Sequence, residues 1–285
     1  MATRTALQTF ERDGLVFDVR DEGPSDGPAV ILLHGFPQTS ASWDAIVPGL
    51  TGAGYRALRP DQRGYSPRAR PRGRRAYRGR ELVADVIALA DQAGVERFHV
   101  VGHDWGAGVG WALAMTRPDR LLSLTALSVP HPAAFARAML TSTQALHSWY
   151  MGFFQIPRLP EALVGAKQGR AMYGNLVRSG LPEQYARQYV EHIREPGALT
   201  AGINWYRGMR PIADAKPVPV TTPTMLLWGD RDSFLRRRGV LATARYVTGP
   251  YRLEILDGVS HWIPEQAPDR IVELLLPHLA AAVAG

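Results

Sequence analysis

One short motif carries a side chain that could act as a nucleophile. It runs from Gly102 to Gly106 (Gly-His-Asp-Trp-Gly), after the apolar run 98–101 and before the small residues 107–110. A buried strand, a nucleophile between two glycines and a helix start form a nucleophile elbow, whose strained turn pushes the central residue out of the sheet edge. The motif therefore predicts that Asp104 is a nucleophile. The alternative is that this aspartate only caps the helix.

An aspartate at the elbow, where many hydrolases have serine, limits the reaction class. A carboxylate is already ionised, so it can attack without a base. Attack on an ester or amide would give an unproductive anhydride, whereas attack on a saturated carbon with a leaving group gives an alkyl ester that water can hydrolyse. Asp104 therefore points to hydrolysis of an epoxide or an alkyl halide.

Hydrolysis of that ester needs a base and an acid that orients it. The apolar run 224–228 is followed by Gly-Asp-Arg-Asp, residues 229–232, and the last apolar run is followed by a loop that contains His261. The order nucleophile, acid, histidine matches Asp104, Asp232 and His261. We expect His261 to deprotonate water and Asp232 to fix its tautomer. Asp230 competes for the acid role, but the preceding strand end would hold it near the turn.

Two backbone amides could stabilise the oxyanion of ester hydrolysis. The segment from His34 to Pro37 (His-Gly-Phe-Pro) directly follows the apolar run 29–33, and the Trp105 amide stands at the start of the predicted helix. Such amides bind developing negative charge. We therefore predict an oxyanion hole made by the backbone N–H groups of Phe36 and Trp105. For His34, His103 and His131, which also stand at strand ends, we expect structural hydrogen bonds.

The elements that must position these residues alternate between strand-like and helix-like segments. Continuous apolar runs are typical of strands buried on both faces of a parallel sheet. The predicted strands are 15–20 (antiparallel), 29–33, 55–58, 98–101, 121–127, 224–228 and 253–256. Helical spacing predicts a helix over 81–93 and a last one over 271–283 that Pro277 interrupts. The fold class is α/β, with helices on both faces of a mostly parallel sheet.

Residues 131–215 break this alternation. They are rich in aromatic residues and helical in pattern. We interpret them as a helical lid inserted over the carboxyl edge of the sheet, where α/β proteins bind ligands. Residues 1–130 and 216–285 then form the core. A lid of this kind predicts a dry, apolar pocket.

Composition narrows the class of protein further. The chain has 285 residues, 46% hydrophobic and 21% charged, which are values of a globular protein. It has no cysteine, so disulfides and thiolate metal sites are excluded, and we expect neither a metal nor a cofactor. No apolar run is long enough for a membrane span, and the first 14 residues lack the core of a signal peptide. We expect a cytoplasmic protein without a membrane partner, with a homodimer possible.

The net charge of +7 comes from one stretch. Residues 63–80 contain eight arginines and no acid, and the rest of the chain has 25 basic and 26 acidic residues. The arginines are Arg63, Arg68, Arg70, Arg72, Arg74, Arg75, Arg78 and Arg80. The stretch favours a solvated loop over a phosphate-binding patch, because no aromatic platform or groove-reading helix accompanies it. Nucleic acid is therefore not an expected partner.

Over nearly its full length the chain resembles the α/β-hydrolase-fold epoxide hydrolases. The matching landmarks are His34-Gly35-Phe36-Pro37, Asp61-Gln62-Arg63-Gly64-Tyr65, Gly102-His103-Asp104-Trp105-Gly106, Trp228-Gly229-Asp230-Arg231-Asp232 and Ser260-His261-Trp262. The resemblance implies a cis peptide before Pro37 and two lid tyrosines that hold the epoxide oxygen, which match Tyr150 and Tyr206. It implies conversion of a small hydrophobic epoxide and water to a vicinal diol. For the substrate site we expect Phe36, Pro37, Trp105, Trp149 and Phe153.

The two tyrosines also distinguish the competing functions. Epoxide opening develops an alkoxide, a much stronger base than tyrosinate, so a phenol can donate a proton to it. A departing halide needs no proton, and a haloalkane or haloacid dehalogenase would instead hold it with indole N–H groups of Trp105 and Trp149 or Trp205. A non-catalytic ligand-binding homologue is a third hypothesis. Tyr150 and Tyr206 could also be ordinary lid aromatics.

Overall fold

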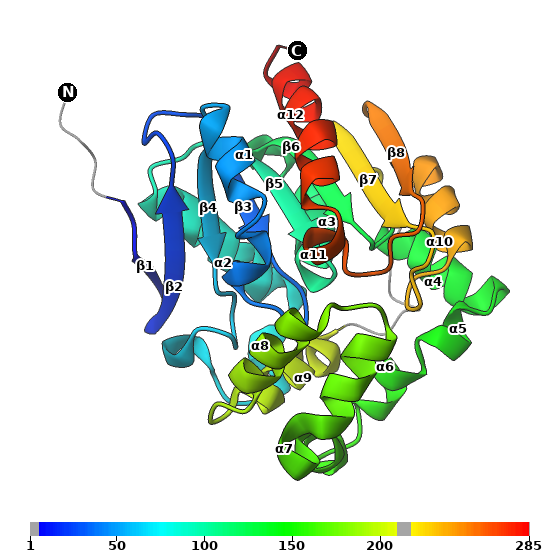
Figure 1. Ribbon diagram of the computed structural model, residues 1–285. Helices are drawn as coiled ribbons and strands as arrows, with labels where there is room; N and C mark the ends of the chain where they lie inside the picture. The colour runs from blue at the N-terminus through cyan, green and yellow to red at the C-terminus, as the bar shows by residue number, and fades with distance from the viewer. Residues whose placement is uncertain (1–5, 210–217, 285) are drawn as a thin grey trace.

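The computed structural model describes residues 6–209 and 218–284. Eight strands form one sheet in the order β1-β2-β4-β3-β5-β6-β7-β8 (Figure 1). β1 and β2 pair antiparallel with their neighbours, and the strands from β4 to β8 are parallel. The strands are β1 (Thr9–Arg12), β2 (Leu15–Glu22), β3 (Ala29–Leu33), β4 (Arg56–Pro60), β5 (Phe98–His103), β6 (Leu121–Leu127), β7 (Thr224–Gly229) and β8 (Tyr251–Leu256). The predicted α/β class and mostly parallel sheet are confirmed; β1 was not predicted.

Helices cover both faces of the sheet because successive side chains of the central strands point to opposite faces. Val30 and Leu32 pack toward one face, with α1 and α12, while Ile31 and Leu33 pack toward the other, with α2 and α3. The core helices are α1 (Val47–Gly52), α2 (Gly79–Gln92), α3 (Trp105–Thr116), α10 (Arg237–Ala242), α11 (Ile263–Gln266) and α12 (Pro268–Ala284), with the short 3-10 turns η1 (Ser40–Trp43), η2 (Pro67–Ala69), η3 (Arg74–Tyr77), η4 (Pro118–Arg120) and η6 (Thr243–Tyr246).

The last helix corrects one prediction. α12 begins at Pro268 and continues through Pro277, so it is not interrupted there. A proline inside a helix removes one backbone hydrogen bond at a cost of about 3 kcal/mol. Leu274, Leu275 and Leu279, on both sides of the proline, are buried against the sheet. We attribute the continuity of the helix to this packing, which offsets the lost hydrogen bond.

Among the described residues, six helices lie between β6 and β7, and α6 to α9 lie below the arrowheads of the central strands in Figure 1. They are α4 (Pro132–Thr141), α5 (Gln144–His147), α6 (Trp149–Phe153), α7 (Leu159–Arg178), α8 (Glu183–Ile193) and α9 (Ala198–Gly208). α4 packs beside the core helix α10, so the start of the lid at residue 131 stays a prediction. Its end at residue 215 lies outside the described residues. Within the described chain, no helix is both long and apolar enough to cross a membrane.

Candidate active site

Asp104 occupies a sharp turn between β5 and α3. Its φ is +50°, which is uncommon for a residue other than glycine. The flanking glycines make the turn possible: a Cβ on Gly102 would lie 2.3 Å from the Gly106 backbone, and a Cβ on Gly106 would lie 2.0 Å from the Leu33 carbonyl oxygen. The strand-turn-helix geometry is that of a nucleophile elbow. The Asp104 side chain makes no capping hydrogen bond to the helix.

The loop after β3 meets the Asp104 carboxylate. The Phe36 amide donates a hydrogen bond of 2.9 Å to Asp104 Oδ1, and the Phe36–Pro37 peptide is cis, as the resemblance implied. Gly35 allows this approach, because a Cβ there would lie 2.4 Å from the Asp104 Cβ. Trp105 is the first residue of α3, so its amide is at the helix N-terminus. The Phe36 amide therefore contacts Asp104, and the role of the Trp105 amide stays a prediction.

We predict that Gly35→Ala slows turnover about 10²-fold or more, the loss typical of one missing oxyanion donor. The added methyl group cannot fit without moving either the Phe36 amide or Asp104. Steady-state kcat and a thermal melt of the variant measure the effect. Gly52→Ala is the matched control, because a Cβ at Gly52 meets nothing within 4 Å. Equal kcat for Gly35→Ala and the wild type would contradict the tight fit.

His261 has one carboxylate partner on each side of its ring. Its Nδ1 lies 2.9 Å from Asp232 Oδ2, and its Nε2 lies 3.6 Å from Asp104 Oδ2. The second oxygen of Asp232 accepts hydrogen bonds from the amides of Phe234 (2.7 Å) and Leu235 (2.9 Å), which fix the buried carboxylate. The structure thus brings together the three residues that the chain order indicates.

The competing acid, Asp230, lies elsewhere. Its carboxylate accepts a hydrogen bond of 2.7 Å from the Gly258 amide, and the residue is exposed. Asp230 therefore stabilises the turn between the strand ends, while Asp232 contacts His261.

The charges of the three residues are coupled. Burial disfavours the imidazolium, but the carboxylates of Asp232 and Asp104 outweigh burial and raise the pKa of His261 to about 10. Burial also opposes ionisation of Asp104, but its bonds to His261 and to the Phe36 amide bring the pKa of the carboxyl below its ordinary value. At neutral pH the site therefore holds an ionised Asp104 beside a protonated His261.

A buried hydrogen-bond network behind the site was not predicted from the sequence. His103 Nε2 and the Ser128 hydroxyl contact the His261 carbonyl oxygen, and His103 Nδ1 contacts Gln38 Oε1. The Gln38 amide group in turn donates to Glu265, which also accepts from the lid residue Tyr189. The network connects the lid, the loop after β3 and the histidine loop. Of its members, Gln38 could have been found from the sequence, because it directly follows the His-Gly-Phe-Pro segment.

The remaining strand-end histidines have structural partners. His34 Nε2 accepts from the Gln62 amide, and its Nδ1 contacts the Gly35 carbonyl oxygen. His131 Nδ1 accepts from the Ala133 amide at the start of α4. Their ring nitrogens thus contact backbone groups through structural hydrogen bonds, as expected from the sequence.

Two lid tyrosines line the same cavity as Asp104. Tyr150 of α6 and Tyr206 of α9 have ring centroids 5.9 Å apart, and the Tyr206 ring lies 4.9 Å from that of Trp105. Both line a cavity of about 1070 Å³ together with Asp104 and Trp105. Burial first, and then the negative charge of Asp104, raises the pKa of each tyrosine, so both remain protonated phenols.

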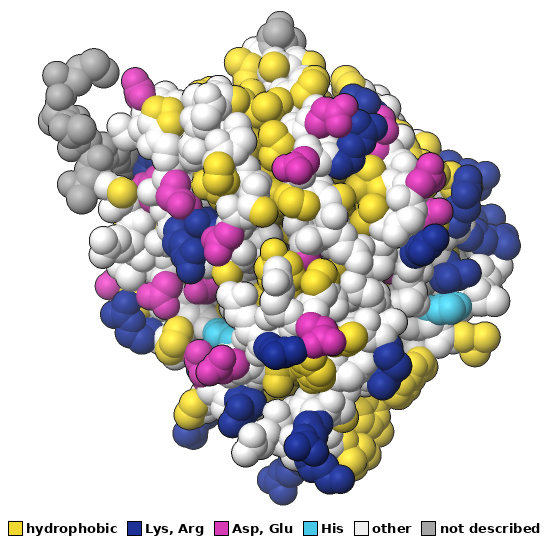
Figure 2. All heavy atoms as spheres, viewed as in Figure 1, with side chains coloured by type: hydrophobic (Ala, Val, Ile, Leu, Met, Phe, Trp, Pro, Cys, Tyr) yellow, Lys and Arg dark blue, Asp and Glu magenta, His cyan; other side chains and the backbone are white. Residues whose placement is uncertain are grey.

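Trp149 does not line that cavity, which corrects a sequence prediction. Its side chain is 66% exposed on the outside of α6, because neighbouring residues on a helix point about 100° apart and Tyr150 takes the inward direction. Phe153 also lies outside the lining and packs beside Trp149 at 5.9 Å. Figure 2 shows hydrophobic side chains gathered on the outer surface of the lid, around the position that α6 and α7 have in Figure 1.

Phe36 and Pro37, which were also expected in the substrate site, do not line the cavity. The Phe36 ring contacts that of Tyr206 at 5.7 Å. Of the five residues expected in the substrate site, only Trp105 lines the cavity directly. Met151 and Trp205 line it and were not named for that role, although both stand within a residue of the predicted tyrosines.

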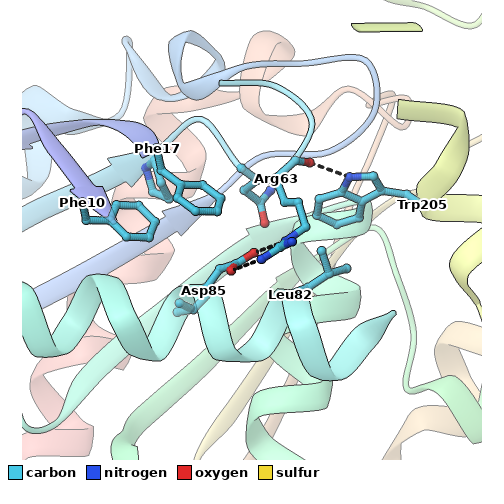
Figure 3. Close-up of a pocket in the computed structure, with 9 residues that line it drawn as sticks. Phe10, Phe17, Arg63, Leu82, Asp85 and Trp205 are labelled. Carbon is cyan, nitrogen blue, oxygen red and sulfur yellow. Dashed lines mark hydrogen bonds and ion pairs between the residues drawn. The ribbon is translucent and has the colours of Figure 1, made fainter. Parts of the chain in front are cut away.

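A buried ion pair within the core adjoins a hydrogen bond that links the lid to the core (Figure 3). The Arg63 guanidinium makes two hydrogen bonds, 2.6 and 2.7 Å, to the Asp85 carboxylate on α2, and the Arg63 carbonyl oxygen accepts one of 2.8 Å from the Trp205 indole on α9. Arg70 pairs with Glu195 of the lid at 2.6 Å. Two of the eight arginines therefore hold the lid, in contrast to a wholly solvated loop.

Comparisons with known proteins agree with this geometry. The sequence profile of the α/β hydrolase fold family matches residues 28–268. The chain belongs to that family. It is 37% identical to the AB hydrolase superfamily protein YfhM of Bacillus subtilis, over 95% of this chain and 97% of the relative. It is 32% identical to Epoxide hydrolase A of Mycobacterium tuberculosis, over 94% and 95% of the two chains.

A solved structure of an epoxide hydrolase is also similar to this chain over nearly its full length. The crystal structure of Epoxide Hydrolase A from Mycobacterium thermoresistibile superposes with a TM-score of 0.81 at 28% identity, covering 97% of this chain and 98% of the other. The protein is therefore an epoxide hydrolase-like α/β-hydrolase. Among the described residues, no group of three or more potential metal ligands is found.

Proposed function

We propose that the protein is an epoxide hydrolase that acts through a covalent ester on Asp104. The observation that carries the proposal is one cavity lined by a carboxylate nucleophile and two phenols, Tyr150 and Tyr206. A nucleophile on one side and proton donors on the other suit a reaction in which a C–O bond forms as another breaks. The names of the relatives support the same activity.

In the first step, an oxygen of Asp104 attacks one ring carbon of the epoxide. The bond between that carbon and the ring oxygen breaks, and the developing alkoxide takes a proton from Tyr150 or Tyr206. The negative charge of Asp104 raises the pKa of both tyrosines, and this charge disappears as the ester forms. The phenols therefore become stronger acids during the step that needs their proton.

In the second step, His261 acts as a base. Esterification removes the Asp104 charge that stabilises the imidazolium, so the pKa of His261 falls. The imidazolium proton passes to the tyrosinate left by ring opening, which leaves His261 neutral. Neutral His261 then takes a proton from water, whose oxygen attacks the ester carbonyl carbon. The amides of Phe36 and Trp105 hold the oxyanion. Collapse breaks the bond between the carbonyl carbon and the alkyl oxygen, which takes the proton from His261, and a vicinal diol is released. The proton of the regenerated Asp104 carboxyl then returns to His261.

The structure favours an epoxide over an alkyl halide as the substrate. Trp149 is exposed, and the Trp205 indole donates to the Arg63 carbonyl oxygen, so neither is free to form a halide cradle with Trp105. Assays of diol formation from styrene oxide and of halide release from chloro- and bromoalkanes test the proposal. Diol without halide release supports it. Halide release alone, or tight binding of styrene oxide without diol, would overturn it.

We predict that Tyr206→Phe and Tyr150→Phe each slow ester formation by about 10²-fold, the contribution typical of a general acid. Each variant keeps the ring contacts and loses only the phenol hydroxyl group. Single-turnover kinetics with excess enzyme measure the step directly. Tyr173→Phe is the control, because that hydroxyl contacts Glu183 on the lid. Unchanged rates for both cavity variants would show that the tyrosines are only packing residues.

A further inference from the structure

The lid has large apolar side chains on its outer surface. Among the described residues, the three most exposed large hydrophobic side chains are Leu140, Leu146 and Trp149, at 85%, 74% and 66%. They stand on the consecutive helices α4, α5 and α6. Leu241 of α10, the core helix against which α4 packs, is also exposed. Exposed apolar side chains that gather in one region mark an interaction site.

Unpaired positive charge lies on the same elements. Five arginines of α4, of α10 and of the segment before α10 are exposed and make no ion pair or side-chain hydrogen bond with a described residue. They are Arg137, Arg231, Arg236, Arg237 and Arg238. The sequence explains why they have no partners nearby, because residues 121–160 and 233–253 contain no aspartate or glutamate.

Hydrogen bonds join the lid to the segment that carries most of these arginines. The Gln144 side chain of α5 accepts a hydrogen bond of 2.8 Å from the Arg236 amide and donates one of 2.7 Å to the Phe234 carbonyl oxygen. The His147 ring contacts the Ser233 carbonyl oxygen at 3.1 Å. The four apolar side chains and the five arginines therefore belong to one surface, which we call the lid edge.

The lid edge is visible at one side of the molecule. Figure 2 shows Lys and Arg side chains around the position that α10 has in Figure 1, and hydrophobic side chains below them, around the position of α5 and α6. The acids nearest in sequence do not cancel the positive charge. Asp232 is buried against His261, and Asp230 accepts a hydrogen bond from the Gly258 amide. Even with Asp230 counted, the lid edge has a surplus of positive charge.

This combination of charge and apolar groups narrows the choice of partner. A second copy of the same surface would match the apolar side chains, but its positive charge would repel that of the first. A nucleic acid would match the charge and leave the leucines and the tryptophan in water. An anionic lipid surface matches both, because acyl chains accept apolar side chains while the head groups attract arginine.

We propose that the lid edge binds the surface of an anionic phospholipid bilayer. The leucines and Trp149 would enter the boundary between head groups and acyl chains, where tryptophan is enriched, and the arginines would contact the lipid phosphates. The expectation of no membrane partner rested on the lack of a spanning segment, and an interfacial surface needs none. Trp149 faces outward, whereas the next residue, Tyr150, lines the cavity. The bound lid would therefore stand between the bilayer and the proposed reaction site.

Binding to phospholipid vesicles tests the proposal. The wild type should co-sediment with vesicles of phosphatidylcholine and phosphatidylserine in equal parts, but not with vesicles of phosphatidylcholine alone, and added salt should weaken the binding. The triple variant Arg236→Gln/Arg237→Gln/Arg238→Gln should bind about 100-fold more weakly, because each arginine near an anionic surface contributes about fivefold. Leu140→Ser/Leu146→Ser should weaken binding about tenfold or more, because two large side chains lose their contact with lipid.

The matched control makes the same change of charge elsewhere. Arg72→Gln/Arg74→Gln/Arg75→Gln alters three exposed arginines outside the lid edge and should bind the mixed vesicles as the wild type does. An equal loss in the two triple variants would overturn the proposal, because net charge alone would then explain the binding. Thermal melts of all variants check that they fold.

Three further results would overturn the proposal. The first is a wild type that binds neither kind of vesicle. The second is a dimer in sedimentation that Leu140→Ser/Leu146→Ser dissociates, without vesicle binding. The third is binding to duplex DNA but not to the mixed vesicles. Styrene oxide turnover without vesicles should be the same in all variants, because none of the altered side chains lines the cavity. Absence of that turnover in the wild type would overturn the proposed function and leave the vesicle result unaffected.

Discussion

Asp104→Asn is expected to lower kcat for diol formation by about 10⁵-fold or more, on the order of the loss when other nucleophiles are removed. Asparagine has nearly the same shape and tolerates the positive φ of the turn, so the elbow is preserved. The amide is a poor nucleophile, and water would have to attack the epoxide directly. Diol release measured with purified protein tests this, after intact mass shows that the asparagine has not deamidated.

The same variant tests the coupling within the site. The carboxylate of Asp104 is one of two that raise the pKa of His261 to about 10. Neutralising it should lower that pKa by roughly one to three units, because one opposite charge nearby has been removed. Titration of the imidazole by NMR measures the shift. Residual turnover above 1% of wild type, or an unchanged imidazole titration, would contradict the proposed roles of the pair.

His261→Gln is expected to stop the reaction at the ester. Alkylation needs only the carboxylate and the tyrosines, whereas hydrolysis needs the base, so kcat should fall about 10⁴-fold while ester formation continues. Intact-mass spectrometry should show the protein plus one substrate, and peptide mapping should place the added mass on Asp104. The Phe36 amide remains in place to hold the ester carbonyl.

A surface histidine provides the comparison. His147 lies on the lid, where its ring contacts the Ser233 carbonyl oxygen. His147→Gln should turn over at the wild-type rate and accumulate no adduct. If His261→Gln also showed no adduct and kept its turnover, the second step would not depend on the imidazole.

Most of the site prediction from the sequence rested on the order of the residues in the chain and on the positions of the strand ends. Buried parallel strands have continuous apolar runs, and their carboxyl ends meet at one sheet edge. Asp104, Asp232 and His261 each follow such a run, so their proximity could be expected before the structure was known. The glycines around residue 104 indicated the turn, because no other residue fits there.

The parts that depend on side-chain direction and long-range packing could not be predicted. Trp149 and Tyr150 are neighbours in sequence, and only the orientation of α6 decides which one faces the cavity. Glu265 and Tyr189 are 76 residues apart, and the pattern around them gives no sign of their hydrogen bond. The stretch of arginines looked solvated because the partners of Arg63 and Arg70 lie outside it: Asp85 is 22 residues from Arg63, and Glu195 is 125 residues from Arg70.

The most direct test of the covalent route is a single turnover in water enriched in heavy oxygen, with enzyme in excess over epoxide. Water attacks the ester carbonyl carbon in the proposed reaction, so Asp104 should gain the heavy oxygen, and the first diol released should contain only ordinary oxygen. Mass spectrometry of the diol and of the peptide with Asp104 measures both. Heavy oxygen in the first diol, with none at Asp104, would show that water opens the epoxide directly and would contradict the ester.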